Sequence, residues 1–281
     1  MNILWNDQIV AKESVIIDPE DRGYQFGDGI YEVVAIYNGE LFEWEAHYER
    51  FLRSAAALSI STQHIIEKLK SNINTLIEEN SVEDGYVYFQ LTRGTAPRFH
   101  AYPAEAVPPV LTGLVKKKDT TNPPPSSMKA ITTEDIRWLR VDIKSLNLLP
   151  NCMAKQKAIE AGVHEAIFIR DQVVTEASSS NLFGVKNGKL YTHPLNHLIL
   201  NGITRQVVLR LASQLNLPVI EEAFTKEALY LMDEVFITNT GVNVCPVTEI
   251  DATQIGDGSC GVITASLMKA FSELLSPKIK V

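Results

Sequence analysis

Two residues of this 281-residue chain have reactive side chains in segments that suit chemistry on a carbonyl compound. Lys144 lies in residues 141–147, VDIKSLN, after a β-branched stretch. Desolvation there would make its amine nucleophilic toward a carbonyl group. Glu176 lies in residues 175–181, TEASSSN, where small hydroxylic neighbours favour a tight polar turn in which it could pair with a pyridinium nitrogen. Taken singly, Lys144 is more simply interpreted as a solvated surface charge, and Glu176 as an ordinary acidic residue in a turn.

Two polar segments could bind a phosphate group. Residues 201–205, NGITR, open an expected helix, whose free N–H groups, positive dipole end and threonine hydroxyl suit an anion. Gly202 would let the backbone approach closely. Residues 238–241, TNTG, follow the apolar stretch 235–237 and offer similar groups. A helix start and a loop that bind nothing are the alternatives.

Two arginines and a histidine could bind anionic groups. Arg50 falls on an expected helix over residues 45–58, where it could hold a phosphate bidentately or pair with an acid one turn away. Arg98 and His100 lie in a Gly- and Pro-bearing loop after the expected strand 86–92. A guanidinium matches the two oxygens of a carboxylate, and the histidine adds a donor. A solvated loop is the alternative.

Strands and helices alternate in the first third of the chain, and strands are more frequent in the second half, which predicts a mixed α/β fold. Residues 3–17 favour a hairpin around 6–7, and further turns are expected at 38–39, 170–171 and 187–188. Apolar residues recur at helical spacing over 62–80. Other helices are expected over 204–216, 225–232 and 261–275, with Thr204 and Thr225 as N-caps.

The clearest break in the chain is residues 116–127, KKKDTTNPPPSS, where prolines and charges favour solvent. We expect a smaller N-terminal α/β domain over residues 1–118, a linker over 119–127 and a larger strand-rich domain with helices over 128–281. The lysine run could be an anion site, but a solvated linker explains it more simply.

Composition narrows the function classes. With 26 basic and 34 acidic residues the formal charge is −8, which argues against a nucleic-acid partner. The first residues do not resemble a signal peptide, and no apolar run approaches the length of a membrane helix. The three cysteines, widely spaced, indicate neither a disulfide framework nor a zinc site. We expect a cytoplasmic protein without metal.

Together these segments resemble the class IV aminotransferases, the fold type IV group of pyridoxal-phosphate enzymes, and within it the members that act on D-amino acids. Residues 21–32, DRGYQFGDGIYE, look like the family's N-terminal signature. The segments around Lys144, Glu176, 202–204 and 232–234 follow in the expected order. The likeness covers almost the whole chain, and it implies the two-domain α/β fold of that group.

The resemblance implies a role for each candidate residue. Lys144 matches the lysine that forms a Schiff base with pyridoxal phosphate and shuttles the α-proton, and Glu176 matches the partner of the pyridine nitrogen. The other matches are Arg50, Ile203, Thr204 and Thr240 for the phosphate cradle, Leu200 for an apolar contact with the ring, and Tyr31, Arg98 and His100 for a trap that binds the substrate carboxylate.

The implied reaction is ping-pong transamination between a D-amino acid such as D-alanine and a 2-oxo acid such as 2-oxoglutarate, giving pyruvate and D-glutamate. In the family the carboxylate trap is completed across a homodimer interface. The chain departs from the D-specific pattern at 239–243, NTGVN, where a Ser/Thr-rich run is typical, and this puts the preferred substrate in doubt. The alternatives are an L-branched-chain aminotransferase, a 4-amino-4-deoxychorismate lyase, and a non-catalytic pyridoxal-phosphate-binding protein that should lack Lys144 or Glu176.

Overall fold

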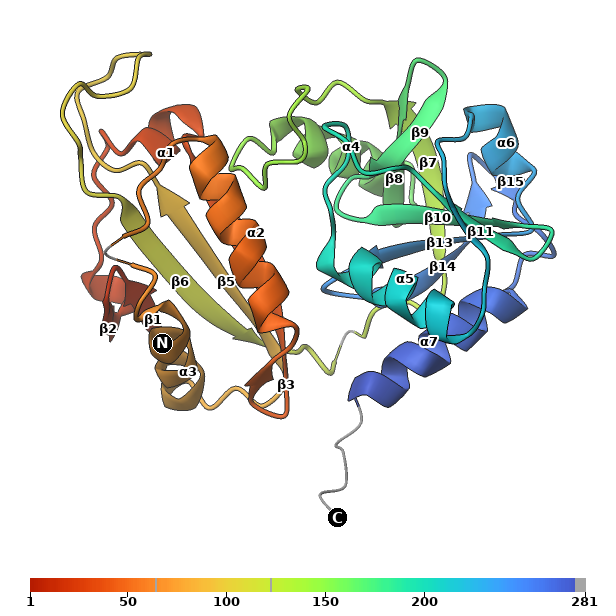
Figure 1. The fold of residues 1–281 in the computed structure, drawn as a ribbon, viewed down its shortest axis with the longest axis horizontal. Coiled ribbons are helices and arrows are strands. Elements are labelled where there is room, and N and C mark those ends of the chain that lie inside the picture. The colour runs from red at the N-terminus through yellow and green to blue at the C-terminus, as the bar shows by residue number, and fades with distance from the viewer. Residues whose placement is uncertain (64, 122, 276–281) are drawn as a thin grey trace. The chain divides into compact units, whose positions relative to one another are not determined.

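The computed structural model describes residues 1–63, 65–121 and 123–275 (Figure 1). The chain divides into two compact units. One consists of Met1–Asn122 with Ile143–Asn147, and the other of Pro123–Asp142 with Leu148–Val281. In the described ranges no helix is both long and apolar enough to cross a membrane. The mixture of helices and strands confirms the expected α/β class.

The first unit is built on a six-stranded antiparallel sheet in the order β2-β1-β6-β5-β3-β4. Helix α2 packs against β3, and α3 packs against β1, β2 and β6. Phe51 and Phe89 lie fully buried in the core between helices and sheet. The strands are β1 Asn2–Trp5, β2 Gln8–Ala11, β3 Gly29–Tyr37, β4 Glu40–Leu41, β5 Gly85–Thr92 and β6 Val110–Lys117, and the helices are α1 Arg22–Phe26, α2 Trp44–Ala57 and α3 Leu69–Glu79, with a 3₁₀ turn at Lys12–Ser14.

Both expected hairpins of this unit are confirmed. Strands β1 and β2 pair around residues 6–7, and β3 turns into β4 at Asn38 and Gly39, whose φ angles are 52° and 76°. The expected helix over 62–80 is shorter, because α3 begins only at Leu69. The Ile65 and Ile66 N–H groups both donate to the Thr62 carbonyl and close a turn instead, while position 64 lies outside the described residues.

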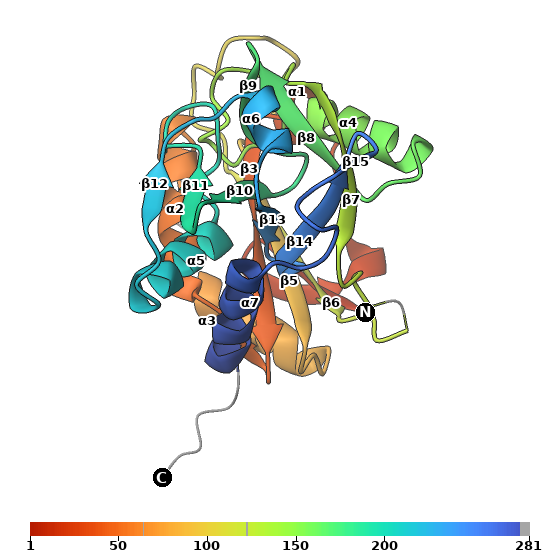
Figure 2. The ribbon, with the colours of Figure 1, turned by 90° about the vertical axis from the view of Figure 1, so that its right-hand side faces the viewer.

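The second unit contains a nine-stranded mixed sheet. Its order is β12-β11-β10-β13-β14-β7-β8-β9, with β15 paired to β14. Helices α5 and α7 lie side by side against β13 and β14, and α4 packs on β7 and β8 (Figure 2). The strands are β7 Met128–Glu134, β8 Glu165–Arg170, β9 Val173–Ala177, β10 Asn181–Lys186, β11 Lys189–Thr192, β12 Val219–Glu221, β13 Glu234–Asn239, β14 Asn243–Ile250 and β15 Thr253–Gln254, and the helices are α4 Leu149–Glu160, α5 Ile203–Gln214, α6 Lys226–Tyr230 and α7 Val262–Leu275.

Local signals of this unit are mostly confirmed. Strands β10 and β11 turn at 187–188, and β8 and β9 turn at Asp171 and Gln172, all with positive φ. Thr225 caps α6 by accepting a hydrogen bond from the Ala228 N–H at 3.2 Å. The expectation that Thr204 caps α5 is wrong, because the helix begins at Ile203 and Gly202 occupies the cap position.

One segment crosses the expected division of the chain. Residues Ile143–Asn147 belong to the first unit although the residues on either side belong to the second. Two backbone bonds hold it there: the Tyr31 N–H donates to the Lys144 carbonyl and the Leu146 N–H to the Gly29 carbonyl, each at 3.0 Å. Ile143 also joins the core of the first unit. The division into domains 1–118 and 128–281 with a linker at 119–127 stays a prediction about separately folding regions.

Candidate active site

Lys144 lies beside the start of β3 in the first unit. Its Nζ sits 4.2 Å from the centre of the Tyr31 ring. Within the described residues Nζ makes no hydrogen bond and no ion pair, and the side chain is half-buried. An amine without an acidic partner is available to react with a carbonyl group. Two candidate residues, Lys144 and Tyr31, are therefore in direct contact.

A buried ion pair fixes Arg50 near this lysine. On β3, Glu32 is fully buried and accepts hydrogen bonds from Arg50 Nε at 2.7 Å and Nη2 at 2.8 Å. His47 Nδ1 lies 2.7 Å from the same carboxylate. Burial raises the pKa of Glu32, but the charge of Arg50 and the hydrogen bonds outweigh it and hold that pKa well below its usual range. Burial lowers the pKa of His47, and although the hydrogen bond and charge of Glu32 raise it, the pKa stays below its usual value.

This pairing limits how Arg50 can bind an anion. The edge formed by Nε and Nη2 is occupied by Glu32, so a phosphate would have to approach the opposite edge of the guanidinium. The expectation of an acid one turn away is wrong, whereas phosphate binding by Arg50 stays a prediction. The acid is Glu32, which lies 18 residues away on a neighbouring strand.

The loop that carries Arg98 and His100 is surrounded by arginines already paired. Asp28 accepts hydrogen bonds from Arg22 Nε at 2.8 Å and from Arg93 Nε at 2.7 Å. Arg22 also donates to the Phe99 and His100 carbonyls, at 2.7 and 3.4 Å. Burial raises the pKa of Asp28, but the bonds from the two arginines keep it below its usual value.

Arg98 differs from its two neighbours. It is exposed, and among the described residues it donates to no carboxylate and no carbonyl. Arg22 and Arg93 are buried and their charges are already matched by Asp28. The loop therefore presents one guanidinium with open donors, as the binding of a free carboxylate requires.

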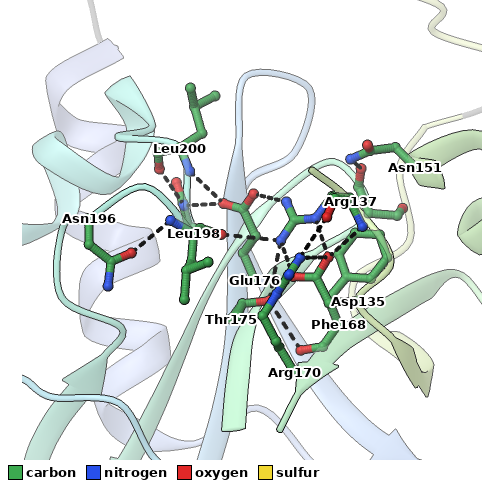
Figure 3. A network of polar contacts seen from close by, with 12 residues as sticks. Asp135, Arg137, Asn151, Phe168, Arg170, Thr175, Glu176, Asn196, Leu198 and Leu200 are labelled. Carbon is green, nitrogen blue, oxygen red and sulfur yellow. Dashed lines mark hydrogen bonds and ion pairs between the residues drawn. The ribbon is translucent and has the colours of Figure 1, made fainter. Parts of the chain in front are cut away.

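Glu176 lies in the second unit at the end of β9, in a network of polar contacts drawn in Figure 3. One carboxylate oxygen forms a short ion pair with Arg137 Nη1. The other accepts from Asn181 Nδ2 at 2.9 Å and from the Leu200 N–H at 3.1 Å. The Asn181 amide also donates to the Leu200 carbonyl at 2.8 Å. The backbone of Leu200 is therefore held by one bond to Glu176 and one to Asn181.

The network behind Glu176 balances its charges. Arg137 holds Asp135 with bonds of 2.8 and 2.7 Å, and Arg170 Nη2 lies 3.0 Å from the same carboxylate. Asp135 is fully shielded from solvent. Burial raises the pKa of Glu176, and the opposing charge of Arg137 limits that rise. Burial likewise raises the pKa of Asp135, but its hydrogen bonds lower it below the usual value.

The start of α5 leaves a hydroxyl available. Ile203 and Thr204 are the first two residues of the helix, and both are buried. Because Gly202 is the cap, the Thr204 hydroxyl is not used as one, and it makes no hydrogen bond within the described part of the chain. At Gly202 a Cβ atom would lie 2.1 Å from Asn181 Oδ1, so only glycine fits here. A helix start with a spare hydroxyl suits an anion such as phosphate.

The departure at 239–243 forms an ordered turn after β13. Asn239 Oδ1 accepts from the Gly241 N–H at 2.7 Å and the Val242 N–H at 2.9 Å. Its amide donates to Ser180 Oγ at 2.8 Å, and that hydroxyl donates to Glu165 Oε2 at 3.2 Å. Asn239 therefore shapes the turn that carries Thr240. Nearby, the buried Thr238 Oγ1 lacks a hydrogen-bond partner in the described ranges.

The candidate residues fall into two groups, one in each unit. Lys144, Tyr31, Arg50, Arg98 and His100 belong to the first unit, and Glu176, Leu200, Ile203, Thr204 and Thr240 to the second.

The residues that orient the candidate side chains were not identified from the sequence. One pair could have been found, because an aspartate often accepts a hydrogen bond from the N–H two residues ahead, as Asp135 does from Arg137 at 3.1 Å. Asn181 lies five residues from Glu176. The other partners are distant in the sequence: Glu32 and His47, Asp28 with Arg93, and Ser180 with Asn239.

Comparisons with known proteins identify the family. Residues 29–250 match the model of the amino-transferase class IV family. A D-alanine aminotransferase of Bacillus licheniformis is 46% identical over 281 residues, covering 100% of this chain and 99% of that protein. One from Staphylococcus epidermidis strain ATCC 12228 is 45% identical over 274 residues, covering 97% of each.

Solved structures of similar proteins agree with the family match. A branched-chain amino acid aminotransferase from Escherichia coli has a TM-score of 0.89 at 25% identity, covering 98% of this chain and 94% of that one. A putative 4-amino-4-deoxychorismate lyase of Legionella pneumophila has a TM-score of 0.80 at 25% identity, covering 93% and 96%. The resemblance found in the sequence is confirmed: the chain belongs to the class IV aminotransferases.

Proposed function

We propose that this protein is a D-amino acid aminotransferase that uses pyridoxal 5'-phosphate to transfer the amino group of a D-amino acid such as D-alanine to a 2-oxo acid such as 2-oxoglutarate. Full-length relatives named D-alanine aminotransferase, at 42–46% identity, support the reaction. Identity to the solved branched-chain aminotransferases is only 24–26%, which supports the fold more than the substrate.

Candidate side chains in each unit suit one part of the cofactor. Lys144 offers an amine without an acidic partner for the aldehyde, and Thr204 offers a spare hydroxyl at a helix start for the phosphate. We assign Arg50, Ile203 and Thr240 to the phosphate as well, and Leu200 to the face of the ring. When bound, the cofactor supplies an electron-withdrawing ring that stabilises negative charge at the substrate α-carbon.

Glu176 would accept a hydrogen bond from the protonated ring nitrogen of the cofactor. Its carboxylate is buried, and Asn181 and Leu200 hold it in a single orientation. Arg137 supplies a compensating charge, which limits the rise in the pKa of this carboxylate that burial causes.

One observation carries the choice of substrate: Arg98 is the guanidinium of its loop whose donors are not bound to an acid. We assign the substrate carboxylate to Arg98, with His100 and Tyr31 beside it. Lys144 Nζ would then take the α-proton and return it on the same face. With the proton fixed toward Lys144, the position of the carboxylate decides between D and L substrates.

Two further proposals concern the location of the protein and its oligomeric state. We place the protein in the cytoplasm, in line with three free cysteines at positions 152, 245 and 260. We also propose a homodimer in which the trap is completed across the interface, with Arg98 and His100 of one copy serving the site of the other. Mixing the inactive Lys144→Ala variant with the impaired Arg98→Ala variant tests this, because subunit exchange should raise the activity above that of the Arg98→Ala variant alone. A mixture that shows no such gain after proven exchange would contradict it.

The proposed function is tested with purified protein. Borohydride reduction followed by peptide mass spectrometry should place the cofactor on Lys144, and label on another lysine would end that assignment. A coupled assay should detect pyruvate from D-alanine with 2-oxoglutarate and much less from L-alanine or L-leucine. Faster turnover of L-leucine would favour the branched-chain alternative, and bound cofactor without any turnover would favour a binding protein.

A further inference from the structure

The ring of Phe26 occupies a fixed place at the end of α1. Asp21 caps this helix by accepting from the Gly23 N–H at 2.8 Å, and it also accepts from Thr92 Oγ1 at 2.8 Å. Gly27, at a φ of 65°, ends the helix directly after Phe26. Left-handed backbone of this kind favours glycine. Caps at both ends of so short a helix fix the backbone from which the ring projects.

This one ring contacts two of the three residues that we assign to the substrate carboxylate. The guanidinium carbon of Arg98 lies over it at 4.7 Å from the ring centre, and the His100 ring lies 5.6 Å away, tilted by 49°. Arg22 lies over the ring as well, at 4.8 Å. Phe26 is half-buried, whereas Arg98 and His100 are exposed. The exposed side chains of Arg98 and His100 therefore both contact a ring that is less exposed than they are.

The backbone of the same loop is fixed by a different group. Arg22 donates to the carbonyls of Phe99 and His100, and its own position is fixed by Asp28. Backbone bonds of this kind place the loop but do not orient its side chains. The side chains of Arg98 and His100 have no hydrogen bond that would orient them among the described residues, which leaves the ring of Phe26 as their contact.

An aromatic ring suits this task. It attracts a cation through the negative potential of its face, without using the N–H donors that a carboxylate needs. An acidic residue would orient Arg98 as well but would compete with the substrate. We propose that Phe26 is the positioning residue of the carboxylate trap: it holds Arg98 and His100 ready for the substrate carboxylate. This inference rests on the proposed function.

The test is a double-mutant cycle of Phe26→Leu and Arg98→Ala in the holoenzyme. Leucine keeps an apolar side chain but removes the aromatic face. Phe26→Leu should raise the KM for D-alanine about three- to ten-fold, with a much smaller change in kcat, because a cation on an aromatic face is weakly but measurably stabilised. In the Arg98→Ala background the same change should raise KM by a clearly smaller factor, because the group that it positions is gone.

A matched control is Phe42→Leu, which removes another half-buried ring of the first unit, one that contacts Tyr37 at 5.7 Å. It should leave the KM for D-alanine unchanged. Thermal unfolding and cofactor absorbance, measured for each variant, report any loss of folding. Equal KM effects of Phe26→Leu in both backgrounds, or no effect in either, would overturn the inference alone. No effect of Arg98→Ala itself would overturn the assignment of the trap in the proposed function.

Discussion

Removal of Arg137 should destabilise the second unit strongly, because it leaves Glu176 buried without its opposite charge. Arg137 bonds Asp135 twice, Glu176 once, and also Thr175 Oγ1 at 3.2 Å and the Leu198 carbonyl at 3.3 Å. Asp135 keeps Arg170 in the variant, so the unpaired charge is that of Glu176. Loss of one partner of a buried ion pair costs about 3–5 kcal/mol. We expect a loss of that size for Arg137→Met.

The chain offers a matched control in Arg140. It also binds an aspartate two residues away with two bonds, both of 2.9 Å to Asp142, but this pair is half exposed. Exposed pairs contribute little to stability. Urea denaturation of the cofactor-free protein should therefore show a large loss for Arg137→Met and no measurable loss for Arg140→Met.

Two further measurements distinguish the effect of an unpaired Glu176 carboxylate from a general loss of packing in Arg137→Met. Burial raises the pKa of Glu176 in the folded protein above its ordinary value of 4.5. Arg137 limits this rise, so its removal lets the pKa of Glu176 rise further in Arg137→Met. As the pH falls through that higher pKa, the folded variant takes up a proton before its unfolded state does and gains stability that the unchanged protein does not. The deficit of Arg137→Met should shrink between pH 8 and pH 5, and Glu176→Gln should restore part of it. A loss below about 1 kcal/mol, or one that is equal at both pH values, would refute this reasoning.

Three other predictions concern single groups. Glu32→Gln should flatten the acid limb of the stability curve below pH 4.5. The pKa of Glu32 is lowered by folding, so as the pH falls below 4.5 the unfolded chain takes up a proton before the folded one does, and stability is lost. Urea titrations at pH 3 and 6 check this, and an unchanged limb contradicts it. Asn239→Ala should weaken pyridoxal phosphate binding about five-fold by freeing the turn that carries Thr240, measured by fluorescence; unchanged affinity contradicts it. Burial raises the pKa of Cys245 to about 11, so iodoacetamide at pH 8 should label the exposed Cys152 first, and the reverse order in peptide mass spectra contradicts this.

Local features of the fold could be predicted from the sequence. The turns at 38–39 and 187–188 are Asn-Gly pairs, and their preference for positive φ belongs to the two residues themselves. Thr225 was identified as a cap for the same reason, since a hydroxyl before a helix finds an N–H group a few residues ahead. The family likeness then relates these distant segments to one reaction.

The partners of the candidate residues were decided by the tertiary structure. Glu176 on β9 pairs with Arg137, which follows β7, across 39 residues, and Glu32 on β3 pairs with Arg50 on α2 across 18. No local pattern fixes which elements become neighbours in this way. Likewise, Lys144 joins the first unit through backbone bonds to β3, although its chain neighbours belong to the second. A turn preference is a property of one or two residues, so it can be predicted from the sequence. A buried charge depends on which strands lie beside it, and this is determined only when the whole chain folds.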